Sequence, residues 1–206
     1  MRRVEIRLSA GLQALNLAPT LAAPLSTYLD ELERWNAAYN LTAVRDRDEM
    51  VTRHLLDSLV VLPHVSGRVL DVGSGAGLPG IPLALANPQL QVTMLDSNGK
   101  KARFMRQAKR VLKLTNVEVV QSRVENYQPA QPFDQVISRA FASLSDFFAA
   151  CARLVSLEGT LLAMKGRLDP AEMAEIPAEV RLIETKKLRV PGLDEERHLV
   201  IAGLKL

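Results

Sequence analysis

Three glycines alternate with other residues directly after a short apolar run, in the stretch LDVGSGAGLPG from Leu70 to Gly80. Glycine lets a backbone turn sharply and lie against a ligand, because it has no Cβ atom to clash. The triplet is a weak signal by itself, since turns also need glycine for structural reasons. The loop is therefore a candidate ligand-binding turn, with Gly75 at its centre.

An acidic residue follows at a spacing that suits the sugar of an adenosine. Asp96 ends the apolar run QVTMLD, nineteen residues beyond Gly77. A carboxylate there can accept hydrogen bonds from both hydroxyls of a ribose, which serves NAD and S-adenosylmethionine equally. Structural roles stay open: Asp96 could cap the helix that follows, and Asp71 could fix the backbone of the loop.

The form of the loop favours a ligand without phosphate. A dinucleotide fold reads Gly-x-Gly-x-x-Gly and enters a long helix whose amino terminus faces the pyrophosphate. Here the pattern is Gly-x-Gly-x-Gly, and prolines follow shortly after it. Because S-adenosylmethionine carries no phosphate, the sequence favours it over NAD.

Positive charge is concentrated in one segment. Residues 97–113, SNGKKARFMRQAKRVLK, contain seven basic side chains and no acid, whereas residues 1–64 contain 7 basic and 8 acidic side chains. Such a segment suits a polyanion such as RNA, and equally a solvated helix face. We take Lys100, Arg103 and Arg106 as candidate RNA contacts.

Two patterns of apolar residues divide the chain. Apolar positions recur every three or four residues from Leu21, and a second stretch, DEMVTRHLLDSLVVL, has Asp48 as a possible N-cap, so both are predicted helices. From Arg68 onward, short apolar runs alternate with glycine turns and helical stretches, which predicts a parallel sheet with right-handed crossovers. One of these helices should begin near Ser143, which has capping-box spacing to Asp146.

The end of the chain indicates the type of α/β fold. VRLIETKKLRV and HLVIAGLKL, joined by PGLDEER, read as a hairpin of two strands. A parallel sheet finished by an antiparallel hairpin is the usual architecture of class I S-adenosylmethionine-dependent methyltransferases, which are Rossmann-like with seven strands. We predict this fold, with an N-terminal helical extension at residues 1–64 packed on a methyltransferase core at residues 65–206.

Composition disfavours several other classes of protein. The first residues contain Glu5 and Arg7 and lack a signal-peptide core, and no uncharged apolar stretch is long enough to span a membrane. We therefore expect a soluble, cytoplasmic monomer without a membrane partner. The lone cysteine, Cys151, has helical apolar spacing and should be buried. The three histidines show no metal-ligand spacing, so no metal is expected.

Longer motifs spread over nearly the whole chain have counterparts in one known family. They are WNAAYNLTAVRD (35–46), RHLLDSLVV (53–61), DVGSGAGLPGIPLA (71–84), LDSNGKKARF (95–104), QSRVE (121–125), FDQVISRAFASL (133–144), KG (165–166) and ERHLV (196–200). Through them the sequence closely resembles the bacterial ribosomal RNA small subunit methyltransferase G family, also called glucose-inhibited division protein B. Ser74 stands where members often carry threonine, a change that keeps the hydroxyl.

The resemblance implies a reaction, a partner and a set of contacts. The reaction would be methyl transfer from S-adenosylmethionine to N7 of one guanine in the decoding region of 16S ribosomal RNA. The partner would be that RNA or the small ribosomal subunit. The adenine of the cofactor would lie near Val124 and Glu125. Carried over by position, cofactor contacts fall at Gly73, Leu78, Val124, Glu125 and Arg139, to which Gly75 and Asp96 add the loop and ribose contacts.

Methylation at N7 makes modest chemical demands. N7 of neutral guanine holds a free lone pair, so the enzyme can contribute mainly proximity and alignment. Arg139 follows the fourth predicted strand, where side chains reach the transfer centre in this fold. Its guanidinium could hold a base edge, a phosphate or the cofactor, so we take Arg139 as the catalytic candidate. The alternative is a surface ion pair, for example with Asp134.

Four further basic residues lie at predicted strand ends or in the hairpin and could bind RNA phosphates: Arg123, Lys165, Arg197 and His198. Two other functions remain open. One is a methyltransferase of a different acceptor, such as a protein or a small molecule, which the basic segment disfavours. The other is a non-catalytic nucleotide-binding or RNA-binding module, which would bind RNA tightly without affinity for the cofactor.

Overall fold

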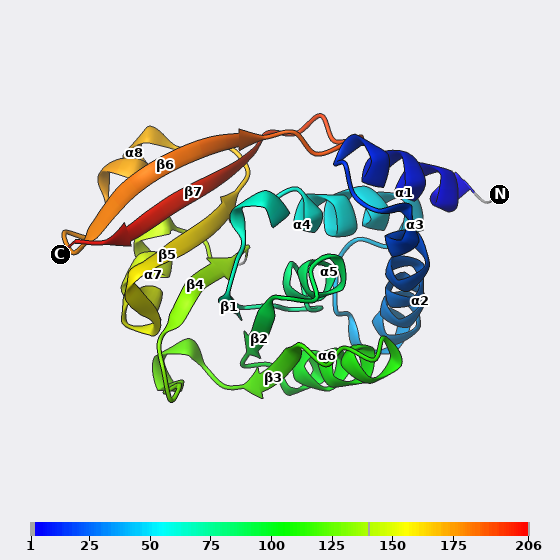
Figure 1. Ribbon diagram of the computed structural model, residues 1–206, viewed down its shortest axis with the longest axis horizontal. Coiled ribbons are helices and arrows are strands. Elements are labelled where there is room, and N and C mark those ends of the chain that lie inside the picture. Colours follow the sequence, from blue (N-terminus) through cyan, green and yellow to red (C-terminus); the bar gives the residue numbers. More distant parts are fainter. Residues whose placement is uncertain (1–2, 140, 206) are drawn as a thin grey trace.

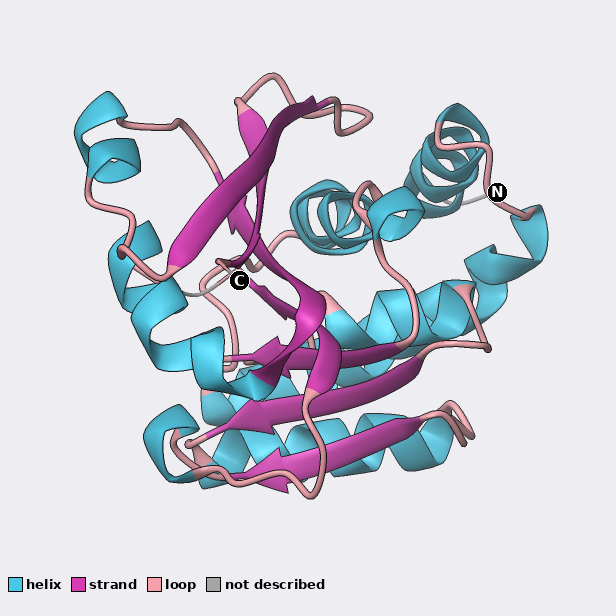
Figure 2. Ribbon diagram, turned by 60° about the vertical axis from the view of Figure 1, so that its left-hand side comes forward, coloured by secondary structure: helices cyan, strands magenta, loops and turns pink. Residues whose placement is uncertain are grey.

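The strands predicted from Arg68 onward pair in one seven-stranded sheet (Figure 2). The structure, a computed structural model, describes residues 3–139 and 141–205. The strand order is β3-β2-β1-β4-β5-β7-β6, parallel from β3 to β5, with β7 antiparallel to both β5 and β6. The strands are β1 (Arg68–Val72), β2 (Gln91–Asp96), β3 (Val117–Gln121), β4 (Phe133–Ser138), β5 (Val155–Lys165), β6 (Val180–Leu188) and β7 (Arg197–Leu204).

The central strands are buried because helices cover both faces of the sheet. β1 and β2 are buried at every position after their first residue, as strands covered on two sides must be. One face packs against α5 (Gly80–Ala86), α6 (Gly99–Val111) and the N-terminal helices, and the other against α7 (Leu144–Cys151). The strand order reverses between β1 and β4, which places a ligand crevice at the carboxyl ends of these strands.

Residues 3–64 are mostly helical, as predicted, and they share a hydrophobic core with the sheet. The amphipathic helix α2 buries Tyr28, whose hydroxyl donates a hydrogen bond to the carbonyl of Ala76 in the glycine loop at 2.7 Å. The division of the chain near residue 65 stays a prediction. The elements are α1 (Arg3–Ala14), η1 (Pro19–Leu21), α2 (Ala22–Tyr39), α3 (Arg47–Met50), the π-helix η2 (Val51–Leu56), α4 (Asp57–Leu59) and η3 (Leu62–His64).

The final hairpin contacts the N-terminal helices through its loop. The loop between β6 and β7 extends away from the hairpin and lies beside α1 and η2 (Figure 1). The short elements between the strands are η4 (Val124–Asn126), η5 (Ala152–Leu154) and α8 (Pro170–Ala174). This arrangement places Glu195 and Arg197 next to the N-terminal helices.

The predicted helix caps are confirmed in one case and wrong in another. Ser143 caps α7 by accepting the backbone N–H of Asp146 at 3.0 Å, as predicted. The cap of the second N-terminal helix is Asp46, which has an extended backbone and accepts the N–H of Glu49 at 2.9 Å. Asp48 lies inside the first turn instead, so its carboxylate is free to pair with Arg3 at 2.9 Å.

Cys151 is fully buried in α7, as predicted. Burial raises the pKa of its thiol to about 12, so it is protonated at neutral pH and packs as an apolar side chain. Within residues 3–139 and 141–205, no helix combines the length and the apolar character needed to cross a membrane.

Candidate active site

The three glycines after β1 have different tasks. All have positive φ, at +70° for Gly73, +59° for Gly75 and +82° for Gly77. A Cβ atom on Gly77 would lie 2.4 Å from Ile81 Cδ1, so packing alone requires glycine there. A Cβ atom on Gly75 would meet no atom within 3.9 Å, so the backbone at Gly75 is open to a ligand. The loop is thus part structural turn and part ligand surface.

Asp71 fixes the far end of this loop. Its side chain is fully buried, and its Oδ2 accepts the N–H of Gly80 at 2.9 Å. Burial raises the pKa of Asp71 to about 7, against the lowering effect of the Gly80 hydrogen bond. The contact seen in the protein is therefore the structural one considered from the sequence, in which Asp71 fixes the backbone of the loop.

Five backbone N–H groups of the loop are already used within the protein, which disfavours a pyrophosphate. The N–H groups of Gly73 and Ser74 both donate to the carbonyl of Leu95, at 2.8 and 3.2 Å. The N–H of Gly75 donates to Asp96 at 2.9 Å, and those of Gly77 and Leu78 donate to the carbonyl of Ser74. A phosphate site needs such groups free. The donor set therefore fits a ligand without phosphate.

Asp96 joins the loop to the start of α6. Its side chain is 7% exposed, its Oδ2 accepts the Gly75 N–H, and its Oδ1 accepts the N–H of Asn98 at 2.8 Å. The cap of α6 is Asn98, which accepts the N–H of Lys100 at 2.9 Å. Each carboxylate oxygen has a second lone pair, so Asp96 keeps capacity for two ribose hydroxyls.

Asp96 lines a cavity of about 320 Å³, which we call the Asp96 cavity. It brings together four residues predicted as cofactor contacts: Gly73, Asp96, Val124 and Glu125. Arg123, predicted as an RNA contact, also lines it. Sequence reasoning missed Lys101 and Phe141; Lys101 lies 3.8 Å from Asp96 and belongs to the basic segment, which was a usable signal.

Two more cavities continue along the carboxyl edge of the sheet. The loop cavity, of about 180 Å³, is lined by Gly73, Gly75, Leu78, Thr42, His54 and Arg139 among others, and it shares Gly73 with the Asp96 cavity. The arginine cavity, of about 370 Å³, shares His54 and Arg139 with the loop cavity. Its lining also includes Arg53, Asp57, Lys165, Gly166, Arg197 and His198. The three cavities therefore lie in a row, with Arg139 between the second and the third.

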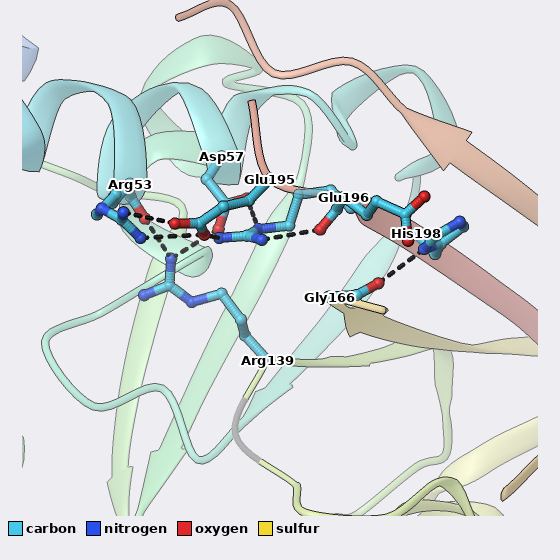
Figure 3. Close-up of polar contacts among 8 residues, drawn as sticks. Arg53, Asp57, Arg139, Gly166, Glu195, Glu196 and His198 are labelled. Atoms are coloured by element: carbon cyan, nitrogen blue, oxygen red, sulfur yellow. Dashed lines mark hydrogen bonds and ion pairs between the residues drawn. The ribbon is translucent and has the colours of Figure 1, made fainter. Parts of the chain in front are cut away.

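Arg139 is held by the N-terminal helices (Figure 3). Its Nη1 donates to the carbonyl of Arg53 at 3.0 Å and to Asp57 Oδ2 at 3.1 Å. The ion pair with Asp134 considered from the sequence is not the one formed, because Asp134 accepts the backbone N–H of Arg68 at 2.7 Å. Arg139 is therefore placed at the predicted site by a partner, Asp57, that the sequence did not reveal.

His54 separates the loop cavity from the arginine cavity and stays neutral. It is 5% exposed, and its Nε2 lies 2.9 Å from Thr42 Oγ1. Burial, together with the charge of Arg139, lowers the pKa of His54 to about 4. A neutral imidazole beside Arg139 adds no further positive charge to the site.

The pKa of His54 predicts how stability depends on pH. The unfolded chain takes up a proton near pH 6.5 and the folded chain only near pH 4, so the free energy of unfolding should fall as pH decreases across that interval. His54→Gln should remove up to about 1.4 kcal/mol of that loss per pH unit. Urea unfolding of both proteins between pH 4 and pH 7 measures the effect. Parallel curves would mean that His54 is protonated in the folded protein.

Apart from Arg123, which lines the Asp96 cavity, the predicted RNA contacts fall into two groups. Lys165, Arg197 and His198 line the arginine cavity, but each has a partner. Lys165 pairs with Glu172 at 2.7 Å, Arg197 pairs with Asp57 at 2.9 Å, and His198 Nδ1 lies 2.7 Å from the carbonyl of Gly166. The second group consists of Lys100, Arg103 and Arg106, which are exposed on α6 and line none of the three cavities. That helix begins directly after Asp96, at the same edge of the sheet.

A larger cavity, of about 510 Å³, lies at the opposite edge, where β1, β2 and β3 begin. Its lining includes Arg68, Gln91 and Val117, the first residues of these strands. Ligands of open parallel sheets bind at the carboxyl ends of the strands, where the loops follow. The glycine loop and Asp96 lie at that end, so we assign the site to the smaller cavities.

Solved structures resemble the chain in fold. TrmN from Thermus thermophilus superposes with a TM-score of 0.58 at 15% identity, covering 75% of this chain and 53% of that protein. The glycopeptide N-methyltransferase MtfA in complex with S-adenosylhomocysteine gives a TM-score of 0.61 at 12% identity, covering 74% and 87%. These comparisons confirm the class I methyltransferase fold predicted from the sequence.

Sequence comparisons identify the family. The family model described as rRNA small subunit methyltransferase G matches residues 22–200. A curated protein of that name from Alkalilimnicola ehrlichii is 55% identical over 187 residues, which are 90% of this chain and 85% of the relative. Another from Xanthomonas campestris is 53% identical over 199 residues, 96% and 94% of the two chains. The chain therefore belongs to the rRNA small subunit methyltransferase G family.

Proposed function

We propose that this protein transfers a methyl group from S-adenosylmethionine to N7 of one guanine in 16S ribosomal RNA. Family membership makes the chain an S-adenosylmethionine-dependent methyltransferase of small-subunit ribosomal RNA. The proposal concerns the acceptor atom and the residues that serve the reaction. The observation that carries it is the row of cavities at the carboxyl edge, with Arg139 between a cofactor side and an acceptor side.

The cofactor would occupy the Asp96 cavity and the loop cavity. Asp96 keeps lone pairs for the ribose, the open backbone at Gly75 leaves room for the ligand, and the loop offers no phosphate site. The proposed cofactor contacts are Gly73, Gly75, Leu78, Asp96, Val124, Glu125 and Arg139. When bound, S-adenosylmethionine supplies an electrophilic methyl group on a positively charged sulfur.

The arginine cavity suits guanine as the acceptor. The Hoogsteen edge of guanine carries two acceptors, N7 and O6, whereas adenine has a donor in place of O6. Arg139 donates only through Nη1 within the described residues, so its Nε and Nη2 groups are available to O6 or to a phosphate. A bond to O6 would hold the base while the N7 lone pair stays free.

The titratable groups beside Arg139 agree with a reaction that needs no proton removal. His54 is a weak base, because burial and Arg139 lower its pKa to about 4. Both oxygens of Asp57 accept hydrogen bonds from arginines. N7 can attack without losing a proton, so alignment in the site would supply most of the rate enhancement.

The RNA partner would lie across the carboxyl edge, with α6 on one side and the hairpin on the other. Proposed phosphate contacts are Lys100, Arg103, Arg106, Arg123, Lys165, Arg197 and His198. Lys165 and Arg197 would have to exchange bonds to carboxylates, Glu172 and Asp57 respectively, for bonds to RNA, which makes them the weakest candidates of these. We further propose that the enzyme acts as a monomer in the cytoplasm, on 16S ribosomal RNA or the assembled small subunit.

Reversing charge on α6 should weaken RNA binding. Arg103→Glu/Arg106→Glu should lower affinity for 16S RNA at low salt. The slope of log affinity against log salt should become shallower by about 2, as expected for the loss of two phosphate contacts. Affinity for S-adenosylmethionine should not change, since neither side chain lines a cavity. Arg181→Glu/Lys205→Glu lies at the end of the hairpin away from Arg197 and His198, removes the same charge and is the matched control.

Filter binding over a range of salt concentrations measures both pairs of variants. Equal losses in the two would show that only net charge matters. Wild-type affinity and slope in the α6 variant would make that helix a solvated face and remove it from the RNA site.

The acceptor atom is tested by nucleoside analysis. Small subunits that lack the modification would be incubated with the protein and S-adenosylmethionine labelled in the methyl group, and the RNA digested to nucleosides. The proposal expects the label in 7-methylguanosine. Label in another nucleoside would assign another acceptor, and tight RNA binding without transfer would indicate a non-catalytic RNA-binding module.

A further inference from the structure

Asp57 is almost fully buried at the centre of the arginine cavity, with 3% of its surface exposed. Its Oδ1 accepts the Nε–H of Arg197 at 2.9 Å, and its Oδ2 accepts an Nη1–H of Arg139 at 3.1 Å. The two arginines come from β7 and from the end of β4, so neither is a sequence neighbour of Asp57. One carboxylate thus holds two guanidinium groups of distant origin together (Figure 3).

The π-helix before Asp57 supplies the second anchor of Arg139. The N–H of Asp57 donates to the carbonyls of His54 and Thr52, which is the wider bonding pattern of a π-turn. A regular α-helix would direct this N–H to the carbonyl of Arg53. That carbonyl instead accepts Arg139 Nη1 at 3.0 Å. Both contacts of Arg139 therefore depend on the local geometry at residues 51–57.

A second carboxylate, that of the exposed Glu195, also binds two arginines of the arginine cavity. Glu195 accepts two hydrogen bonds from Arg53, at 2.6 and 3.1 Å, and one from Arg197 Nη2 at 3.1 Å. These bonds lower the pKa of Glu195, so it stays ionised. Three guanidinium groups thus face two carboxylates, and the cluster of Arg53, Asp57, Arg139, Glu195 and Arg197 keeps one net positive charge. Glu195 is exposed and bonds Arg53 and Arg197 at the surface, whereas Asp57 is buried and bonds Arg139 directly.

The consequence for Arg139 is a fixed orientation. An unrestrained arginine has many rotamers, and holding one of them on binding costs conformational entropy. Without Asp57, the charges of Arg139 and Arg197 would also repel each other across the cavity. With Asp57, both bonds of Arg139 engage Nη1 alone, which leaves the Nε and Nη2 donors in one direction. Such pre-organisation is what an orienting arginine requires.

We propose that Asp57 is a positioning residue for methyl transfer, which acts by fixing Arg139 beside the acceptor base and does not itself touch the substrate. The inference rests on the proposed function, because it takes the arginine cavity as the acceptor site. The alternative is a purely structural role, in which the ion pair of Asp57 with Arg197 joins the N-terminal helices to β7 and stabilises the fold without acting through Arg139.

A double-mutant cycle separates these two roles. Asp57→Asn keeps the size of the side chain and removes its charge. In the wild-type background we expect the single-turnover rate at saturating S-adenosylmethionine to fall at least about tenfold, because small misplacements of orienting groups have large effects. In the Arg139→Ala background the same substitution should change the remaining rate by less than about twofold, since coupled residues are not additive.

The matched control is Glu33→Gln, which breaks an ion pair with Arg47 between α2 and α3, away from the three cavities. It should leave the transfer rate unchanged. Cofactor affinity, measured by calorimetry, should stay within about twofold of wild type in Asp57→Asn and in Glu33→Gln, because neither residue lines the Asp96 cavity or the loop cavity. Thermal melts show that each variant is folded at the assay temperature.

Two results would overturn the inference: a wild-type rate in Asp57→Asn, or an equal fall of the rate with Arg139 present and with Arg139 replaced by alanine. If Asp57→Asn does not fold, Asp57→Glu keeps the charge, displaces the carboxylate by one methylene, and enters the same cycle with the same two criteria. A wild-type protein that makes no 7-methylguanosine would instead contradict the proposed function. The two failures are therefore distinguishable.

Discussion

Replacing Arg139 with alanine is expected to slow methyl transfer by about 100-fold or more at saturating cofactor, because proximity and alignment supply most of the rate. Stability should change much less. Asp57 keeps Arg197 as a partner after the substitution, so no buried carboxylate is left without a cation. Single-turnover transfer to small subunits measures the rate, and thermal melts run alongside measure the stability.

Lysine at position 139 separates orientation from charge. A lysine ammonium keeps the positive charge but has no planar fork. With two of its three donors on Asp57 and the Arg53 carbonyl, it would present one donor in place of the Nε and Nη2 groups of arginine. We expect Arg139→Lys to recover little of the rate. Full recovery would mean that the role is electrostatic, and a wild-type rate in Arg139→Ala would remove the residue from the site.

Replacing Asp96 with alanine is expected to weaken S-adenosylmethionine binding by roughly 1.5 to 3 kcal/mol, the value of a lost pair of ribose hydrogen bonds. The substitution also frees the N–H groups of Gly75 and Asn98, so part of the loss would come from a looser loop. Isothermal titration calorimetry measures the affinity. The same titration with NAD should show no binding to the wild type, because the loop donors are occupied.

Asp46→Ala is the matched control for the Asp96 variant. Asp46 likewise accepts a backbone N–H through its side chain, at 2.9 Å from Glu49, but it lines none of the three cavities. It should lower stability by about 1 kcal/mol as a lost helix cap and leave cofactor affinity unchanged. Unchanged affinity in Asp96→Ala would show that the ribose lies elsewhere.

Local patterns in the sequence predicted most of the fold. The strand positions, the glycine loop and the final hairpin follow from apolar runs and turn residues that lie close together in the chain. The wrong prediction of Asp48 as a helix cap has a local reason as well. Asp46 and Asp48 are both acceptable N-cap residues, and backbone conformation decided between them, with Asp46 extended at ψ 127°.

The contacts within the site were predictable only in part. Gly73, Asp96, Val124 and Glu125 line one cavity because each follows a strand of the same sheet edge, which strand order makes predictable. His54 and Asp57 gave no such signal, because they reach the site from the π-helix η2 and from the start of α4, which pack across that edge. Which acid would pair with Arg139 depended on this packing, so the sequence suggested Asp134 where the protein uses Asp57.

We propose that one continuous site runs from Asp96 through the glycine loop to Arg139. A crystal structure of the protein with bound S-adenosylhomocysteine tests it most directly. We predict the ribose hydroxyls within hydrogen-bond distance of the Asp96 carboxylate, the adenine beside Val124 and Glu125, and the sulfur facing Arg139. A ligand in the larger cavity at the amino ends of β1, β2 and β3, or a ribose bound away from Asp96, would contradict the account.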